Sequence, residues 1–243
     1  DLLDRVADAH PDDLAVTFLG RTQSWANFAD RARRQGAALQ ALGVGEGDRV
    51  GVLAMNSARF MEAFYGPLYA DAVMVPLNYR WALPEMVQCM EDSMPTVLMV
   101  DENYINEARA IKTQCGFCKH LIFIGEGQTP EGFLDYEALL QSAHSDLRSN
   151  RRGDDLAALF YTGGTTGFPK GVMLSHLNIT SAARSVASYL GYGPEDRIFC
   201  AVPMISRIAI YRVTISWRTG NSLFWKPWLT WLPPVMVMSW RLA

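Results

Sequence analysis

The residues of this sequence best suited to chemistry lie in one glycine- and threonine-rich stretch, YTGGTTGFPKGVMLSH at residues 161–176. Glycines let the backbone approach a ligand, and successive backbone N–H groups in such a loop form a concavity that holds an anion. Threonine hydroxyls reach a phosphate or its Mg²⁺, and a lysine adds a positive charge. The stretch therefore predicts a polyphosphate-binding loop. Its candidate residues are Thr162, Gly163, Gly164, Thr165, Thr166, Gly167 and Lys170.

Two common nucleotide motifs do not fit this chain. A Walker A loop has lysine directly after its last glycine, whereas a phenylalanine and a proline precede Lys170 here. The glycines within residues 43–47 miss the Rossmann spacing by one residue, so they predict a surface turn. The remaining alternative for residues 161–176 is a plain hairpin, because apolar runs at 156–161 and 171–174 flank the loop as two strands.

Composition favours a globular protein that acts on small molecules. The chain has 243 residues, 25 acidic against 22 basic side chains, 49% hydrophobic and 19% charged residues. This length supports a large core without metals or disulfides. A net charge of −3 with no block of basic residues excludes the electrostatic pattern of nucleic-acid binding, so no nucleic-acid partner is expected.

The cysteines and the N-terminus indicate a cytoplasmic setting. The four cysteines do not form the spaced framework of a secreted protein, and Cys115 and Cys118 lack the second pair that a zinc site needs. Residues 1–20 carry five aspartates and no apolar region, unlike a signal peptide. Because the first residue is not methionine, we expect the true N-terminus to lie upstream.

Up to about residue 204, helical and strand patterns alternate, which predicts an α/β fold with largely parallel, covered sheets. Ser24 is the expected N-cap of the helix at 25–42, and Gly43 is expected to end it. The polar segment 145–155 predicts a boundary between two lobes. Further helices are expected at 58–71, 84–92, 103–114, 135–144 and 177–190, and strands at 49–54, 73–75, 97–100, 121–124, 156–161, 171–174 and 197–202.

The last 39 residues follow different statistics. Residues 205–243 contain no acidic residue, five basic residues and five of the seven tryptophans. Three prolines and Lys226 interrupt the apolar stretch 222–240, so no stable membrane span is expected, although a tail that anchors the chain to a membrane stays an alternative. The chain is therefore divided into residues 1–204 and a divergent tail, 205–243.

The loop at 161–175 resembles the signature (Y/F)TSGTTGxPKGV of the adenylate-forming superfamily, which includes acyl-CoA synthetases. Four other segments resemble the N-terminal domain of acyl-CoA synthetases in the expected order: ALGVGEGDRVGVLAMNS (41–57), YADAVMVPLNYRW (69–81), EDS (91–93) and DDLAALFYT (154–162). The resemblance covers about residues 1–204. It implies a truncated, multilayered α/β N-terminal domain of an adenylate-forming enzyme.

The resemblance also implies a reaction. In the family, this loop closes on the β- and γ-phosphates of ATP, with the residue matching Thr162 near Mg²⁺, while a carboxylate attacks the α-phosphate. The resulting acyl-adenylate then passes its acyl group to CoA. The implied substrates are a fatty or aryl acid, ATP with Mg²⁺, and CoA, and the resemblance leaves the acid and the oligomeric state open. Gly163 stands where serine is commoner.

Several family segments have no match here. The segment after Pro203 lacks the aromatic and histidine of the family's acyl pocket, and the YGxTE and TGD segments are missing. The family's catalytic lysine lies in a C-terminal domain that also has no match, so no catalytic residue is assigned. We expect residues from about Ile205 onward to come from a shifted reading frame, with a natural short variant as the alternative. The chain alone is then expected to be an inactive fragment that binds nucleotide weakly at most.

Overall fold

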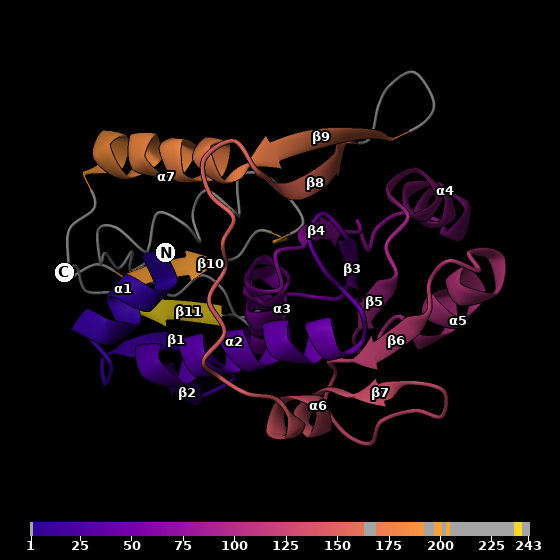
Figure 1. The fold of residues 1–243 in the computed structure, drawn as a ribbon, viewed down its shortest axis with the longest axis horizontal. Helices are drawn as coiled ribbons and strands as arrows, with labels where there is room; N and C mark the ends of the chain where they lie inside the picture. The colour runs from indigo at the N-terminus through magenta and orange to yellow at the C-terminus, as the bar shows by residue number, and fades with distance from the viewer. Residues whose placement is uncertain (1, 163–168, 192–196, 201–202, 205–235, 240–243) are drawn as a thin grey trace, which may run out of the picture. The chain divides into compact units, whose positions relative to one another are not determined.

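The computed structural model describes residues 2–162, 169–191, 197–200, 203–204 and 236–239. They form two compact units (Figure 1). Of the described residues, unit 1 contains those within 2–30, 56–58 and 177–239, and unit 2 contains those within 31–55 and 59–176. The alternation of helices and strands predicted an α/β fold, and this prediction is confirmed.

Unit 2 is built on a sheet whose described strands are parallel except at one edge. Apolar β-branched runs such as VLMV pair on both sides and are buried along their whole length, as expected for a covered parallel sheet. In spatial order the described strands are β7 (Leu134–Asp135), β6 (His120–Phe123), β5 (Val97–Val100), β3 (Arg49–Leu53), β4 (Val73–Pro76), β8 (Leu156–Thr162) and β9 (Lys170–Ser175).

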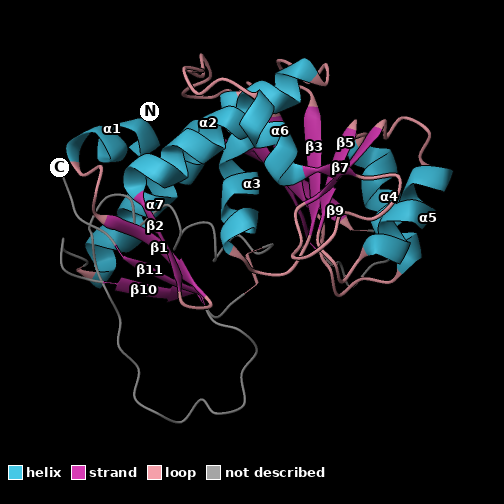
Figure 2. Cartoon of the chain, turned by 90° about the horizontal axis from the view of Figure 1, so that it is seen from below, coloured by secondary structure: helices cyan, strands magenta, loops and turns pink. Residues whose placement is uncertain are grey.

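Helices cover both faces of this sheet (Figure 2). On one face, α4 (Leu83–Ser93) and α5 (Ile105–Gln114) bury side chains such as Met86 and Ile111 against strand residues. The other face carries α2 (Trp25–Ala41), α3 (Ala58–Tyr69) and α6 (Tyr136–Ser142). Together these layers place the carboxyl ends of the parallel strands at one edge of unit 2.

The predicted ends of α2 are confirmed. At its start, the Asn27 amide donates to Ser24 Oγ at 3.3 Å, which satisfies one of the free N–H groups of the first turn. At its end, Gly43 adopts a φ of +85°, and the Val44 amide reaches back to the Leu39 carbonyl at 3.0 Å. This is a helix C-terminus with a residue in the left-handed conformation, a position that strongly favours glycine.

In unit 1, the described strands form an antiparallel sheet, so the expectation of parallel strands is wrong there. The order is β10 (Arg197–Cys200), β11 (Met236–Ser239), β1 (Leu14–Phe18) and β2 (Arg21–Ser24). Strands β1 and β2 form a two-residue hairpin at Leu19 and Gly20, whose φ values of +49° and +77° match the twist of paired strands. The unit also contains α1 (Leu2–Ala9) and α7 (His176–Leu190).

The predicted lobe boundary at residues 145–155 is also wrong, because this segment lies inside unit 2. The Ser149 hydroxyl donates to Asp71 Oδ1 at 2.7 Å, and Arg151 pairs with Glu46. Arg151 also lies 3.4 Å from the Asp155 carboxylate. A polar segment read as a linker is thus held to the unit by side-chain hydrogen bonds that composition alone does not show.

Helices α2 and α3 approach each other closely at a glycine. A Cβ atom added to Gly36 would lie 2.6 Å from Tyr69 Cβ and 3.0 Å from the Gly66 carbonyl oxygen. Neither atom moves without the backbone of α3. We therefore expect Gly36→Ala to lower the free energy of unfolding by about 1 to 3 kcal/mol, as overpacking does elsewhere.

Urea unfolding checks this prediction, with Gly116→Ala as the control, because a Cβ atom at Gly116 meets open space. If the two variants unfold at the same urea concentration, the close contact in unit 2 has no energetic weight.

A buried ionic network joins α2, α3 and α6. Arg31 binds the fully buried Glu62 with two hydrogen bonds of 2.6 and 3.0 Å, and it binds Glu137 with two more of 2.8 and 2.7 Å. The Tyr136 hydroxyl donates to Glu62 Oε2 at 2.7 Å. Arg59 adds a second cation, with its Nε 3.1 Å from Glu137 Oε1. Arg31 therefore bridges two carboxylates on two different helices, and Arg59 supplies the second positive charge.

This network makes stability sensitive to acid. Hydrogen bonds from Arg31 hold the pKa of Glu137 below its ordinary value of 4.5, although burial opposes them. A carboxylate whose pKa is lowered by folding stabilises the protein above its unfolded pKa and loses that contribution as pH falls. We expect the free energy of unfolding to fall below about pH 5.

Glu137→Gln removes this titration, so the variant should lose less stability than the wild type between pH 6 and 3, even if it is weaker at pH 7. Urea unfolding across this pH range measures the difference. Parallel pH curves for the two proteins would contradict the assignment.

Candidate functional site

The two strands predicted on either side of the glycine-rich loop are present, and they pair antiparallel as the stem of the loop. Thr162 at the end of β8 faces Lys170 at the start of β9, and Thr162 Oγ1 lies 3.5 Å from the Lys170 carbonyl oxygen. Both side chains are exposed. The other five candidates, residues 163–167, lie outside the described residues. The structure thus places the two residues that border the loop opposite each other across the strand pair.

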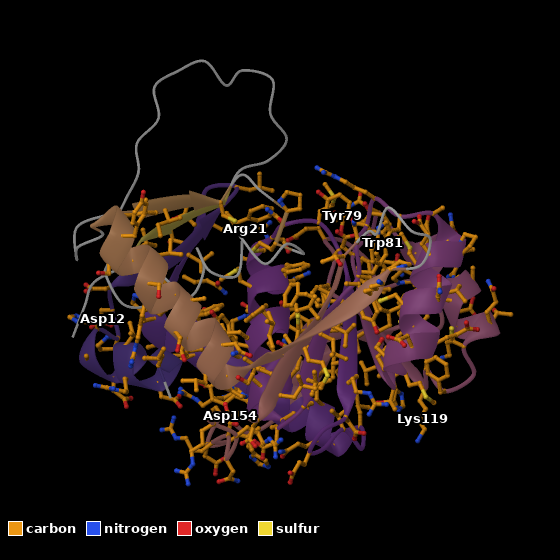
Figure 3. All side chains as sticks on the ribbon, turned by 90° about the horizontal axis from the view of Figure 1, so that it is seen from above. Asp12, Arg21, Tyr79, Trp81, Lys119 and Asp154 are labelled. Atoms are coloured by element: carbon orange, nitrogen blue, oxygen red, sulfur yellow. The ribbon has the colours of Figure 1, made fainter. Side chains whose placement is uncertain are left out.

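The loop begins at the carboxyl edge of the parallel sheet, where open α/β sheets bind ligands. Tyr79 and Trp81, which follow β4, lie at this end of unit 2 in Figure 3. Asp154 and Lys119, which precede β8 and β6, lie at the opposite end (Figure 3). The direction of the strands therefore identifies the edge with Tyr79 and Trp81 as the one suited to ligands, and the edge with Asp154 and Lys119 as the opposite one.

Two further side chains at this edge were not singled out from the sequence. Asp101, buried after β5, accepts the Met55 amide at 2.6 Å and the Asn103 amide at 3.0 Å. Burial raises the pKa of Asp101 above its ordinary value of 3.8. Tyr104 stacks on Tyr79 with ring centroids 6.0 Å apart. The signal was available, since polar residues that directly follow buried parallel strands gather at one edge.

The other residues considered in the sequence analysis have structural roles. All four cysteines are buried free thiols, and burial raises the pKa of Cys118 to about 11. Within the described ranges, no three His, Cys, Asp or Glu side chains gather as metal ligands. Asp155 accepts the Arg152 amide at 2.9 Å in a turn. The glycines within 43–47 also form the predicted turn, with positive φ at Gly43 and Gly47.

Comparison with known proteins identifies the family. A model of the AMP-binding enzyme family matches residues 3–237. The chain belongs to the AMP-binding enzyme family. A long-chain-fatty-acid–CoA ligase of Thermus thermophilus is 34% identical over 183 residues, which are 74% of this chain and 33% of that protein. A 3-hydroxybenzoate–CoA/4-hydroxybenzoate–CoA ligase of Thauera aromatica is 31% identical over 210 residues, 86% of this chain and 38% of that protein.

Solved structures of AMP-binding enzymes share the fold. The anthranilate CoA ligase AuaEII in complex with anthranoyl-AMP has a TM-score of 0.82 at 25% identity, covering 93% of this chain and 45% of that one. The N-terminal domain of FACL13 from Mycobacterium tuberculosis has a TM-score of 0.79 at 30% identity, covering 92% and 57%. The expected mixed α/β fold, which matches the N-terminal part of these CoA ligases, is therefore confirmed.

The chain spans about a third of the length of the curated AMP-binding relatives that it matches first, 33% and 35% of two of them. The family match reaches residue 237 and so includes most of the tail, but residues 205–235 lie outside the described part of the structure. Among the helices that the structure describes, none is long and apolar enough to span a bilayer. The anchoring alternative concerned the tail, of which the structure describes only residues 236–239.

Proposed function

We propose that this chain is the first part of an ATP-dependent ligase that activates a fatty or aryl acid to an acyl-adenylate and then to acyl-CoA. The observation that supports it most is the family signature loop, set on a hairpin at the carboxyl edge of the parallel sheet. Family membership supports acid activation in general. The relatives named above are ligases for fatty and for aromatic acids, which supports these two substrate classes without choosing between them.

The donors around the loop fit MgATP. We assign Thr162 the role of a hydroxyl near Mg²⁺ and Lys170 that of a positive charge on the β- and γ-phosphates. The glycines and threonines at residues 163–167 are the proposed backbone and hydroxyl donors between them. These groups position the phosphates and neutralise their charge, which is the main protein contribution to such transfers.

The alternative is that the chain as it stands is an inactive fragment with weak nucleotide binding. The short coverage of the relatives favours this alternative for the chain alone. Exchange of labelled pyrophosphate into ATP, assayed with a panel of fatty and aryl acids, separates the two. Exchange that depends on an added acid establishes activity in this chain. With no exchange under any acid, only nucleotide binding remains as its function.

We propose further that residues from about Ile205 onward come from a shifted reading frame. The proposal rests on the simultaneous loss of acidic residues and gain of tryptophan and arginine after Met204. Accurate sequencing of the encoding DNA tests it. A second frame that continues into YGxTE, TGD and a late lysine supports the shift. Two frames without those segments make the tail genuine.

A further inference from the structure

One side chain connects the stem of the glycine-rich loop to a helix on the sheet. Tyr161, one residue before Thr162, is 9% exposed and packs in the core beneath α4 and α5. Its hydroxyl donates a hydrogen bond to Asp92 Oδ2 in the last turn of α4. Burial, followed by the hydrogen bond to Asp92, raises the pKa of Tyr161, so the hydroxyl keeps its proton and remains the donor.

The same ring also contacts the second strand of the stem. Tyr161 pairs with Gly171 across the hairpin, and a Cβ atom added to Gly171 would lie 3.1 and 3.2 Å from two atoms of the tyrosine ring and 3.3 Å from its hydroxyl oxygen. The ring therefore covers the glycine backbone of β9. Among the described strands, β9 pairs only with β8. The position of β9 in the sheet therefore depends on its backbone hydrogen bonds to β8 and on this contact with the Tyr161 ring.

The position of Asp92 is unfavourable for the helix that carries it. A negative charge in the last turn of a helix opposes the helix dipole, and no basic residue stands in the last turn of α4 to offset it. The Asp92 side chain is otherwise exposed. The stability of α4 therefore does not explain an aspartate at this position, whereas its hydrogen bond to the buried Tyr161 does.

We infer that Asp92 is a positioning residue for the phosphate loop, acting through Tyr161 to hold the β8–β9 stem in register against α4. The inference rests on the proposed function, because it assigns this tether to the loop proposed to bind ATP. Thr162 follows Tyr161 directly, and Lys170 precedes Gly171. The ends of the loop are therefore fixed in space before the phosphates arrive, which reduces the ordering that binding requires.

Hydrogen exchange of the 243-residue chain tests the tether without nucleotide. Tyr161→Phe keeps the ring and removes the hydroxyl, and Asp92→Asn keeps the shape and removes the charge. Each should speed amide exchange at residues 160–162 and 170–172 by about tenfold or more, the usual weight of a hydrogen bond to a charged group. Amides of β3 serve as the internal reference. The control is Tyr104→Phe, which removes a hydroxyl that contacts Met55 Sδ at 3.5 Å.

Nucleotide affinity then separates positioning from general stability. AMP lacks the β- and γ-phosphates proposed to contact the loop, so both variants should bind MgATP about tenfold more weakly while AMP affinity stays unchanged. Equal weakening of MgATP and AMP would overturn the inference, because a merely structural role affects both. Unchanged exchange rates in the stem would overturn it too. If the wild type binds neither nucleotide, the proposed function fails, and the exchange rates alone decide the inference.

Discussion

Replacing Arg31 with methionine is expected to lower the free energy of unfolding by about 3 to 5 kcal/mol. Glu62 has no exposed surface, and Arg31 is its bidentate partner, so the variant leaves a buried carboxylate without its cation. Removing one partner of a buried ion pair lowers stability much more than replacing both partners with apolar residues. The desolvation cost of the remaining charge is then no longer offset by an opposite charge. Urea unfolding followed by circular dichroism measures the loss.

The same change at an exposed arginine provides the control. Arg109 is an exposed residue that donates one hydrogen bond of 3.1 Å to the Glu131 carbonyl and lies over the Phe133 ring, 5.8 Å from its centroid. Because these contacts are at the surface, Arg109→Met should shift stability by less than about 1 kcal/mol. The double variant Arg31→Met with Glu62→Met should recover much of the loss, since no buried charge remains. A single variant as stable as the wild type would show that Glu62 does not depend on Arg31.

Replacing Lys170 with alanine is expected to weaken MgATP binding by about tenfold to a hundredfold. Lys170 is exposed beside Thr162 at the end of the loop stem, and a charged hydrogen bond to a phosphate contributes about 1.5 to 3 kcal/mol. AMP binding should change little, because the lysine is assigned to the outer phosphates. Isothermal titration calorimetry of the chain with each nucleotide measures both affinities.

Lys119→Ala is the matched control, because this exposed lysine lies at the opposite edge of unit 2 (Figure 3). It should leave MgATP affinity within about twofold of the wild type. If both lysine variants bind MgATP equally well, Lys170 does not contact the phosphates. If both weaken binding equally, the effect is one of net charge, which added salt would abolish.

Local sequence signals predicted most helices and strands of unit 2, although they missed the two-residue strand β7. Helix α2 begins after Ser24 and ends before Gly43 as the capping residues predict, and the buried runs that form β3, β5 and β8 are readable from their apolar residues. Element prediction was weaker in unit 1. The hairpin at Leu19 and Gly20 lacks the asparagine or aspartate that marks most such turns, and the strands it joins are short and partly exposed.

The sequence by itself determined the family and the stem of its loop, because one run of glycines, threonines and lysine is specific to that family. It could not show which distant residues meet. Arg31, Glu62 and Glu137 are separated by up to 106 positions, and Tyr161 and Asp92 by 69. Their contacts depend on how helices cross the two faces of the sheet, and side-chain packing in three dimensions decides this. The loop can therefore be recognised from the local sequence, whereas the hydrogen bond between Tyr161 and Asp92 beside it is visible only in the tertiary structure.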